Sequence, residues 1–333
     1  MADITVLGDG IAALAITYHA VLNNMTVKVI SANGRFAKNY RGGRFIYQPN
    51  DGIFKDLVKL VDPHYTSGPL GGGVALYTDG PIELHTWESL VSDKVLAGRV
   101  VHLYSDTTGR PWSQKLLNNI LEWDKVPQVI STPYQLLANH MLYTVGKLCH
   151  LVDFYAGLVR HVSTDCHNLT YSSVEGGSDW TCPYKHLVST IPAYIFGGLV
   201  DHAPVAQSMV DLDYTSPRFC RADVLPDHFI LPSQEMLYFI GDKVEEKTGL
   251  PIKRRTCIPG WAITEFSSKP KIKGIHILPP NIPDISCAQS IQMENELAAS
   301  DIHLLGRFSQ MKSKMMMSHI VTDSYELINK IGA

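Results

Sequence analysis

The fold is decided near the start of the chain by residues 3–30, which read DITVLGDGIAALAITYHAVLNNMTVKVI. Apolar and β-branched residues predict a short buried strand over residues 3–7 and a second strand over 26–30. The apolar spacing between them predicts a helix over residues 11–22, and glycines lie between the first strand and this helix. A strand, a glycine turn, a helix and a second strand in this order predict the first unit of a parallel α/β sheet.

The turn after the first strand has the spacing G-x-G-x-x-A, formed by Gly8, Gly10 and Ala13. Gly8 permits a tight turn, Gly10 leaves room for a pyrophosphate to touch the backbone, and Ala13 lets the helix pack close to the strand. The free backbone N–H groups of the first helical turn, at Ile11 and Ala12, would then bind the anion. The alternative is an ordinary strand-to-helix turn of another α/β domain. The position of the triad between a predicted strand and a predicted helix favours dinucleotide binding.

The end of the second strand departs from the usual dinucleotide pattern. An Asp or Glu commonly binds the ribose hydroxyls at this position, and this chain has Ser31. A serine hydroxyl still forms a hydrogen bond with a ribose, although a weaker one than a carboxylate forms. We therefore expect the adenosine end of a dinucleotide to be held less tightly here, or by another residue.

Composition places the chain among ordinary globular proteins. Its 333 residues are 45% hydrophobic and 18% charged, which allows two domains, or one Rossmann-type domain with a large insertion, and excludes long disordered stretches. With 29 basic and 32 acidic residues the net charge is −3, so a polyanion would have to bind a local patch. No apolar run reaches the roughly 18 to 20 residues of a membrane span, and no membrane partner is expected.

The cysteines and the first residues indicate the expected compartment. The six cysteines include no C-x-x-C pair and none lies near a His pair, so we expect reduced thiols, no zinc knuckle and no other metal site. The first residues lack the basic region and cleavage site of a signal peptide. A cytoplasmic location is therefore expected, in the host cytoplasm if the protein is viral.

Four stretches that lie far apart in the chain share their motifs with one protein family. They are the opening fingerprint, the loop Arg41-Gly42-Gly43-Arg44, the strand that runs HLVSTIP over residues 186–192, and Leu305-Gly306-Arg307 before a predicted helix over 318–331. Together they resemble the glutathione-reductase-like flavoproteins, most closely the branch of UDP-galactopyranose mutases, amine oxidases and protoporphyrinogen oxidases. Residues 43–51, GRFIYQPND, are similar to the mutase stretch Pro-His-Ile-Phe-His-Thr-x-Asn, and Gly306-Arg307-Phe308 with Lys312 and Met316 is similar to the mutase ending.

The resemblance implies the fold class and the domain organisation. It implies an α/β protein with a discontinuous, Rossmann-like FAD-binding domain over residues 1–60, 150–200 and 300–333. A mixed α+β substrate-binding domain would then be inserted, over residues 61–149 and 201–299. The stretch 34–55 is expected to be a basic, glycine-bearing loop rather than a helix.

The resemblance also implies how FAD would be bound. Gly42 and Gly43 would pass near the ribityl chain, and Val159 would meet the adenine through its backbone. Gly306 and Arg307 would close over the pyrophosphate, and Met316 would border the isoalloxazine ring. The alternatives are an ordinary loop turn for Gly42-Gly43 and a turn with a surface cation for Gly306-Arg307.

The candidate catalytic residues are Arg44, Tyr47 and Lys312. Arg44 and Tyr47 stand where the mutases keep histidines, which weakens the case for mutase chemistry. A desolvated Lys312 near flavin would hold a water or an oxygen species, whereas a solvated lysine would have no role. The leading hypothesis is therefore an FAD-dependent oxidoreductase or lyase that oxidises an amine with C–N cleavage. The alternatives are a mutase-like flavoenzyme without net redox change and a non-catalytic flavin-binding module.

A basic stretch suggests one kind of amine-bearing substrate. Residues 242–275 hold eight Lys or Arg and four Asp or Glu, a local balance of +4, with Trp261 among them. Arg254, Arg255 and Trp261 could bind a phosphate backbone and stack on a base, and the alternative is an ordinary solvated hairpin. With the short chain, this stretch suggests a phage enzyme that acts on an amino-acid-modified thymidine in DNA, converting a glycyl group to an aminomethyl group. The sequence predicts no oligomeric state.

Overall fold

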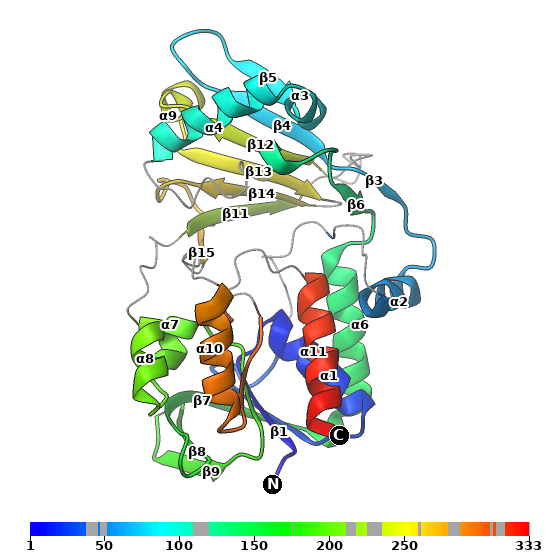
Figure 1. Cartoon of the computed structure of the whole chain (residues 1–333), viewed down its shortest axis with the longest axis vertical. Helices are drawn as coiled ribbons and strands as arrows, with labels where there is room; N and C mark the ends of the chain where they lie inside the picture. The colour runs from blue at the N-terminus through cyan, green and yellow to red at the C-terminus, as the bar shows by residue number, and fades with distance from the viewer. Residues whose placement is uncertain are drawn as a thin grey trace.

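In a computed structural model the chain forms two units, each built around a seven-stranded sheet and lying one above the other (Figure 1). The structure describes residues 1–37, 46, 52–108, 120–174, 176–210, 218–224, 235–258, 261–278, 287–306, 309–310 and 317–332.

The first sheet contains the predicted opening strands. Its order is β16-β10-β1-β2-β7-β8-β9. The strands are β1 (Ile4–Leu7), β2 (Val27–Ser31), β7 (Val152–Ser163), β8 (Asn168–Ser173), β9 (Asp179–Pro183), β10 (Leu187–Ser189) and β16 (Ile302–Leu304). The strands from β16 to the first half of β7 pair in parallel, and the second half of β7 continues into an antiparallel meander with β8 and β9. This parallel sheet with helices on its faces confirms the predicted α/β class.

Helices cover both faces of the first sheet. Alternate strand residues point to opposite faces, so Val6 and Val188 enter one apolar core while Leu7 and Leu187 enter the other. One core is covered by α1 (Ile11–Leu22), α2 (Gly52–Val61), α6 (Tyr134–Lys147) and α11 (Met317–Gly332). The other is covered by α7 (Ala193–Gly197), α8 (Ala203–Val210) and α10 (Cys287–Ala298), as Figure 1 shows.

The alanines of α1 explain its central position. Ala13, Ala15 and Ala20 are fully buried, and these small side chains let neighbouring helices and strands approach closely. The helix has the predicted bounds and packs against both α6 and α11. It is apolar on nearly all sides, as expected for a helix enclosed within a core.

Three helices lie in a different unit from the one expected from sequence. Helices α6, α8 and α10 fall within the ranges assigned to the inserted domain, but their apolar side chains pack on the first sheet. Met141 of α6, Met209 of α8 and Leu297 of α10 are all buried there. Helix α2 also begins at Gly52, within the stretch 34–55 that was expected to be a loop.

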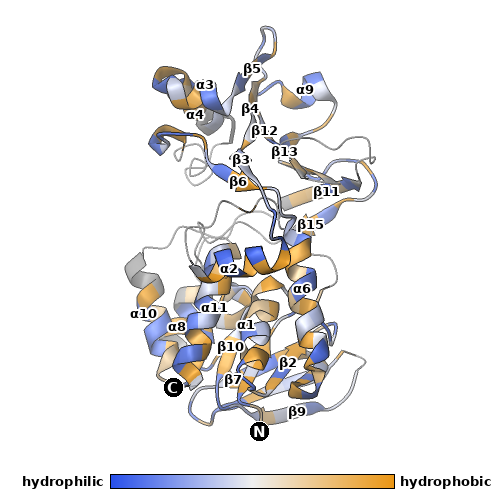
Figure 2. Cartoon of the chain, turned by 90° about the vertical axis from the view of Figure 1, so that its right-hand side faces the viewer, coloured by the Kyte–Doolittle hydropathy of each residue, from blue (hydrophilic) through white to orange (hydrophobic). Residues whose placement is uncertain are grey.

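The second sheet is mostly antiparallel, with the order β15-β11-β14-β13-β12-β4-β5. Its strands are β4 (Gly71–Leu76), β5 (Glu83–Thr86), β11 (Arg218–Val224), β12 (Glu235–Ile240), β13 (Ile252–Ile258), β14 (Trp261–Phe266) and β15 (His276–Leu278). Helices α3 (Trp87–Ser92) and α4 (Lys94–Thr108) pack on it around the buried Trp87. Figure 2 shows hydrophobic residues along the strands and helices of the lower unit, including β10 and α1.

Several short elements lie outside the two larger sheets. Strands β3 (Ser67–Pro69) and β6 (Gln128–Ile130) form a two-stranded ribbon between the two larger sheets, helix α9 (Val244–Thr248) follows β12, and a 3-10 turn (Cys149–Leu151) precedes β7. Among the described helices, none has both the length and the apolar character needed to cross a membrane.

Candidate dinucleotide site

The carboxyl ends of β1, β2, β10 and β16 meet at one edge of the first sheet, because these strands are parallel neighbours. This edge faces the second unit (Figure 1). Ligands of open α/β sheets bind at the carboxyl ends of the strands, so this edge is where a dinucleotide is expected.

Gly8 makes the tight turn that follows β1. Its φ of +115° lies in the region that favours glycine, and a Cβ at this position would collide with the Thr190 hydroxyl. That hydroxyl donates a hydrogen bond to the Leu7 carbonyl at 2.7 Å, and the Gly8 N–H donates to the Ile30 carbonyl at 2.9 Å. The fold itself therefore requires glycine at position 8.

Gly10 differs from Gly8 because packing does not require it. Its φ of −76° suits any residue, and a Cβ added there would meet no described atom within 4 Å. Gly10 is the N-cap residue of α1, and it has no side chain with which to cap the first-turn N–H groups. The first turn also contains no acidic residue. The open space beside Gly10 therefore gives an anion access to these N–H donors.

Ser31 ends β2 with a hydroxyl that has no partner. The residue is only 5% exposed, and its Oγ has no hydrogen-bond partner among the described residues. Buried hydroxyls are usually hydrogen-bonded, and an unsatisfied one costs about 1–3 kcal/mol. A ligand hydroxyl at this edge would satisfy it.

The loop after β2 is held against the glycine turn by Asp9. The Asn33 side-chain amide donates to the Asp9 carboxylate at 2.7 Å, and the Ala37 N–H donates to the Asp9 carbonyl at 3.1 Å. Neither Asp9 nor Asn33 is among the site residues predicted from sequence. Their only signal was a polar residue in each of two loops, which does not show that the loops meet.

Gly306 lies directly on the first turn of α1. Its φ is +95°, and a Cβ there would be 2.7 Å from the Cβ of Ala12. The turn after β16 is fixed by Gln310, whose Oε1 accepts from the Gly306 N–H at 3.1 Å, and by Ser309, whose hydroxyl donates to the Ser189 carbonyl at 2.7 Å. The two predicted glycine elements, far apart in sequence, are therefore neighbours in space.

Val159 is a further cofactor-binding candidate among the residues that the structure describes. Val159 is in β7, where it is paired with Tyr171 of β8 beyond the part of β7 that pairs with β2. Seven predicted residues lie outside the described residues, and their roles stay predictions: Gly42, Gly43, Arg44, Tyr47, Arg307, Lys312 and Met316.

The basic stretch 242–275 is divided by the structure into internal and exposed parts. Arg254 donates to Glu265 at 2.7 Å and to the Tyr238 hydroxyl at 2.6 Å, so it is engaged within the sheet. Lys243 pairs with Asp79 and Glu246, and Lys247 donates to two backbone carbonyls. The remaining basic side chains that are exposed are Arg255, Lys269, Lys271 and Lys273.

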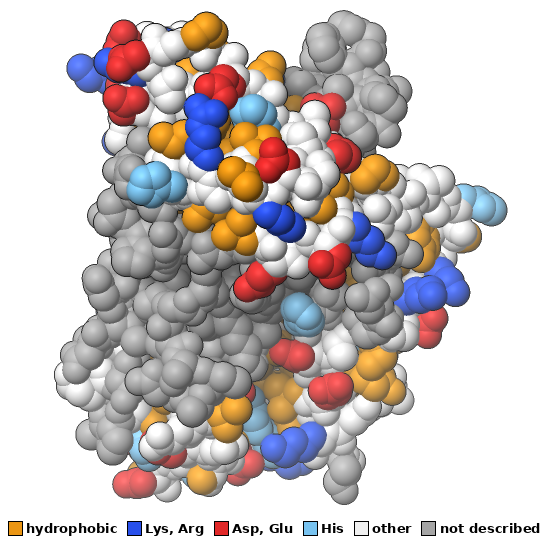
Figure 3. Space-filling view, turned by 45° about the horizontal axis from the view of Figure 1, so that its top comes forward, with side chains coloured by type: hydrophobic (Ala, Val, Ile, Leu, Met, Phe, Trp, Pro, Cys, Tyr) orange, Lys and Arg blue, Asp and Glu red, His pale blue; other side chains and the backbone are white. Residues whose placement is uncertain are grey.

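Arg255 follows Arg254 in β13, so the two side chains leave opposite faces of the sheet. Trp261 is the first residue of β14, and the structure describes its backbone but not its side chain. On the face turned forward in Figure 3, Lys and Arg side chains are interspersed with Asp and Glu rather than gathered into one patch.

No protein-family model and no curated protein matches the sequence. Solved structures do match in fold. A reduced UDP-galactopyranose mutase has a TM-score of 0.66 at 12% identity, covering 99% of this chain and 94% of that chain. A CLA-producing fatty acid isomerase from P. acnes has a TM-score of 0.59 at 11% identity, covering 99% and 98%. Cyclohexylamine oxidase from Brevibacterium oxydans IH-35A has a TM-score of 0.58 at 11% identity, with the same coverage. At these identities the likeness shows the fold, which this chain shares with a mutase and an amine oxidase of the kinds that its motifs resemble.

Proposed function

We propose that this chain is an FAD-dependent flavoenzyme that oxidises an amine with C–N cleavage. The observation that carries the proposal is the open backbone surface beside Gly10, where a Cβ would meet no atom of the described residues within 4 Å.

The residues at this edge fit the parts of FAD. The first-turn N–H groups of α1 would bind the pyrophosphate, and the backbone at Gly306 would flank it. The unsatisfied Ser31 hydroxyl would bind a ribose hydroxyl at the end of β2, the position that ribose-binding residues commonly occupy. When bound, the flavin supplies the acceptor for a hydride or an electron pair, and the protein supplies position and electrostatics.

Amine oxidation by a bound flavin requires few catalytic side chains from the protein. A neutral amine held in an apolar pocket is oxidised to an imine, which water then hydrolyses, and no dedicated catalytic acid is needed. The motif resemblance and the fold likeness to cyclohexylamine oxidase support an amine as the substrate class.

The finer proposal is an amine carried on a modified thymidine in phage DNA. Oxidation of the C–N bond of a glycyl substituent would remove two electrons, and hydrolysis of the imine would leave an aminomethyl group on the base and release a two-carbon aldehyde acid. The exposed side chains of Arg255, Lys269, Lys271 and Lys273 support a polyanionic substrate.

The absorption spectrum of the purified protein tests the proposal. We expect a flavin spectrum that bleaches on anaerobic addition of the substrate amine, with candidates that include amine-bearing DNA. Gly10→Val should abolish flavin retention while leaving the fold intact, because the added side chain enters open space in the protein itself.

Gly146→Val is the matched control, since a Cβ added to Gly146 would also meet no described atom within 4 Å, and Gly146 lies in the last turn of α6, outside the glycine turn. Normal yellow colour in Gly10→Val would contradict this cofactor placement. A protein that stays colourless after incubation with FAD would instead favour a non-catalytic module.

A mutase-like flavoenzyme is the second candidate, because the fold similarity is greater to the mutase than to cyclohexylamine oxidase. Such an enzyme would require a reductant for activity without consuming it stoichiometrically. Spectral changes of the reduced protein on addition of a UDP-sugar, with no response to amines, would favour this candidate over amine oxidation.

A further inference from the structure

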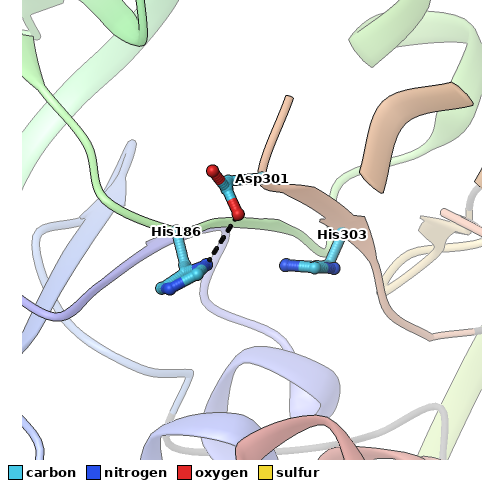
Figure 4. A group of neighbouring side chains, drawn as sticks. All are labelled: His186, Asp301 and His303. Atoms are coloured by element: carbon cyan, nitrogen blue, oxygen red, sulfur yellow. Dashed lines mark ion pairs between the residues drawn. The ribbon is translucent and has the colours of Figure 1, made fainter. Parts of the chain in front are cut away.

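Three potential metal ligands meet at the edge of the first sheet opposite the candidate dinucleotide site. His186 directly precedes β10, Asp301 directly precedes β16, and His303 lies within β16. Strands β10 and β16 are parallel neighbours, with Val188 opposite His303, so their amino ends share this edge. Figure 4 shows the two imidazole rings on either side of the Asp301 carboxylate.

The spacing of the donor atoms is close to that of a metal site. The Nδ1 of His186 is 3.3 Å from Oδ1 of Asp301. One donor atom from each of the three residues lies within 4.8 Å of the other two. A tetrahedral zinc ion with bonds of about 2.1 Å holds its ligands about 3.4 Å apart. The donor atoms of His186 and Asp301 already have about this separation, and rotation of the His303 side chain would bring its ring nitrogen to a similar distance from both.

One nitrogen of each histidine lacks the hydrogen bond that a buried imidazole nitrogen normally makes among the described residues. The Nε2 of His303 is buried and has no hydrogen-bond partner among the described residues. The Nδ1 of His186 is also buried, and its contact with Asp301 has the distance of an ion pair without the geometry of a hydrogen bond. Because buried polar atoms are rarely left unsatisfied, two such nitrogens around one carboxylate indicate a missing ligand.

Asp301 is held in place by the backbone. Its N–H donates to the Ala298 carbonyl at 3.1 Å, and its carbonyl accepts from the Leu187 N–H at 2.9 Å. Its second carboxylate oxygen lies 3.9 Å from Nδ1 of His167, outside the cluster. The carboxylate therefore needs no backbone movement to serve as a ligand.

A cavity lies beside His303. It has a volume of about 320 Å³ and is lined by His303, Glu294, Asp323, Glu326 and Lys330, among others. The positive charges of Lys330 and Lys185 would repel a cation near the histidines. The negative charges of Asp301, Asp3 and the carboxylates that line the cavity would attract it. The carboxyl-terminal turn of α11, where Lys330 lies, adds the negative end of a helix dipole.

We propose that His186, Asp301 and His303 bind a divalent transition-metal ion of the zinc type, with water completing the coordination. Two imidazoles and one carboxylate suit Zn²⁺, Co²⁺ or Ni²⁺ better than Mg²⁺ or Ca²⁺, which prefer oxygen ligands. The bound ion would tie together the amino ends of β10 and β16 and stabilise the folded state. The sequence predicted no metal site, because Asp301 and His303 are close in the chain but His186 reaches them only through the pairing of β10 with β16.

Calorimetric titration of the untagged, chelator-stripped full chain with Zn²⁺ tests the proposal. We expect one Zn²⁺ per chain and a higher Tm with the ion than without it. His186→Ala and His303→Ala should each weaken binding by at least about tenfold, since each removes a ligand. Co²⁺ should give the visible absorption of a tetrahedral site in the wild-type protein and lose it in both variants.

His150→Ala is the matched control, because His150 is exposed and distant from the cluster in the fold. If a variant fails to fold, the conservative Asp301→Asn variant replaces it, with the same expected loss. The absence of binding to the folded wild-type protein would overturn the proposal, as would unchanged binding in the folded ligand variants. The test is independent of the flavin, since Gly10→Val should bind Zn²⁺ as the wild type does.

Discussion

Arg254 and Glu265 form an ion pair across strands β13 and β14, with Nη2 of the arginine 2.7 Å from Oε2 of the glutamate. Their side chains are only 13% and 6% exposed. Removal of one partner from a buried pair leaves a charge uncompensated and costs about 3–5 kcal/mol. We expect Arg254→Met to lower the free energy of unfolding by this amount in urea denaturation. Arg255→Met should change it by less than about 0.5 kcal/mol, and equal losses in both variants would contradict the assignment.

The exposed neighbour, Arg255, is therefore the residue with which to test DNA binding. Arg255→Glu should weaken binding to DNA, and the slope of log affinity against log salt should fall by about one if the side chain contacts a phosphate. Fluorescence anisotropy over a range of salt concentrations measures both quantities. Lys59→Glu, an exposed site on α2 in the first unit, serves as the control. Equal affinity of Arg255→Glu and wild type would remove this residue from the proposed substrate site.

Gly8→Ala should destabilise the fold rather than affect the cofactor alone. The positive φ and the collision with the Thr190 hydroxyl together predict a loss on the order of 1–3 kcal/mol in the free energy of unfolding. The double variant Gly8→Ala/Thr190→Ala should recover the steric part of this loss, and a double-mutant cycle measures it. Strict additivity of the two substitutions would show that the two residues are not coupled.

Ser31→Ala separates binding from stability. Removal of an unsatisfied buried hydroxyl should leave the stability of the cofactor-free protein unchanged or slightly higher. The Kd for FAD should rise about fivefold, which corresponds to one hydrogen bond of about 1 kcal/mol. Ser324→Ala is the control, since the Ser324 hydroxyl already bonds to the Ile320 carbonyl within α11. Unchanged FAD affinity in Ser31→Ala would place the ribose elsewhere.

His19 should make stability depend on pH. Burial lowers the pKa of His19 from 6.5 to about 4, so the folded protein keeps a neutral imidazole while the unfolded chain takes up a proton. Protonation of His19 therefore does not affect the free energy of unfolding above about pH 6.5. As the pH falls from there toward 4, the free energy of unfolding decreases by up to about 3 kcal/mol. Urea denaturation of His19→Gln at pH 7.5 and pH 5 should show a smaller difference than in the wild type. His150→Gln should keep the wild-type difference, and a wild-type difference in His19→Gln would contradict this assignment.

The local part of the fold could be predicted from sequence, and the second sheet could not. Helix α1 has the predicted bounds, because the glycine turn and the apolar spacing are local signals. Strand β4 begins Gly71-Gly72-Gly73, a composition that disfavours a strand. A Cβ at Gly72 or Gly73 would collide with the backbone of the neighbouring strands, so glycine is required by pairings with β12 and β5 that the sequence does not reveal.

Sequence likewise predicts the local features of the candidate site and not those that depend on the tertiary structure. The spacing of Gly8, Gly10 and Ala13 is a local signal, and the structure brings Gly306 to the same turn. The cluster of His186, Asp301 and His303 depends on the order of strands in the sheet, which no spacing along the chain encodes. Strand alternation predicts that Arg254 and Arg255 lie on opposite faces, but only the packing shows that Arg254 is on the buried side.

Residues 302–332 complete the first sheet and its helical layer, since β16 forms one edge of the sheet and α11 packs on α1. During synthesis the apolar surface of α1 that α11 covers must stay open until residues 302–332 have left the ribosome. Contacts between residues far apart in sequence slow folding and prolong the exposure of aggregation-prone apolar surface. The nascent protein should therefore depend on chaperones, and its yield should respond to their supply and to growth temperature.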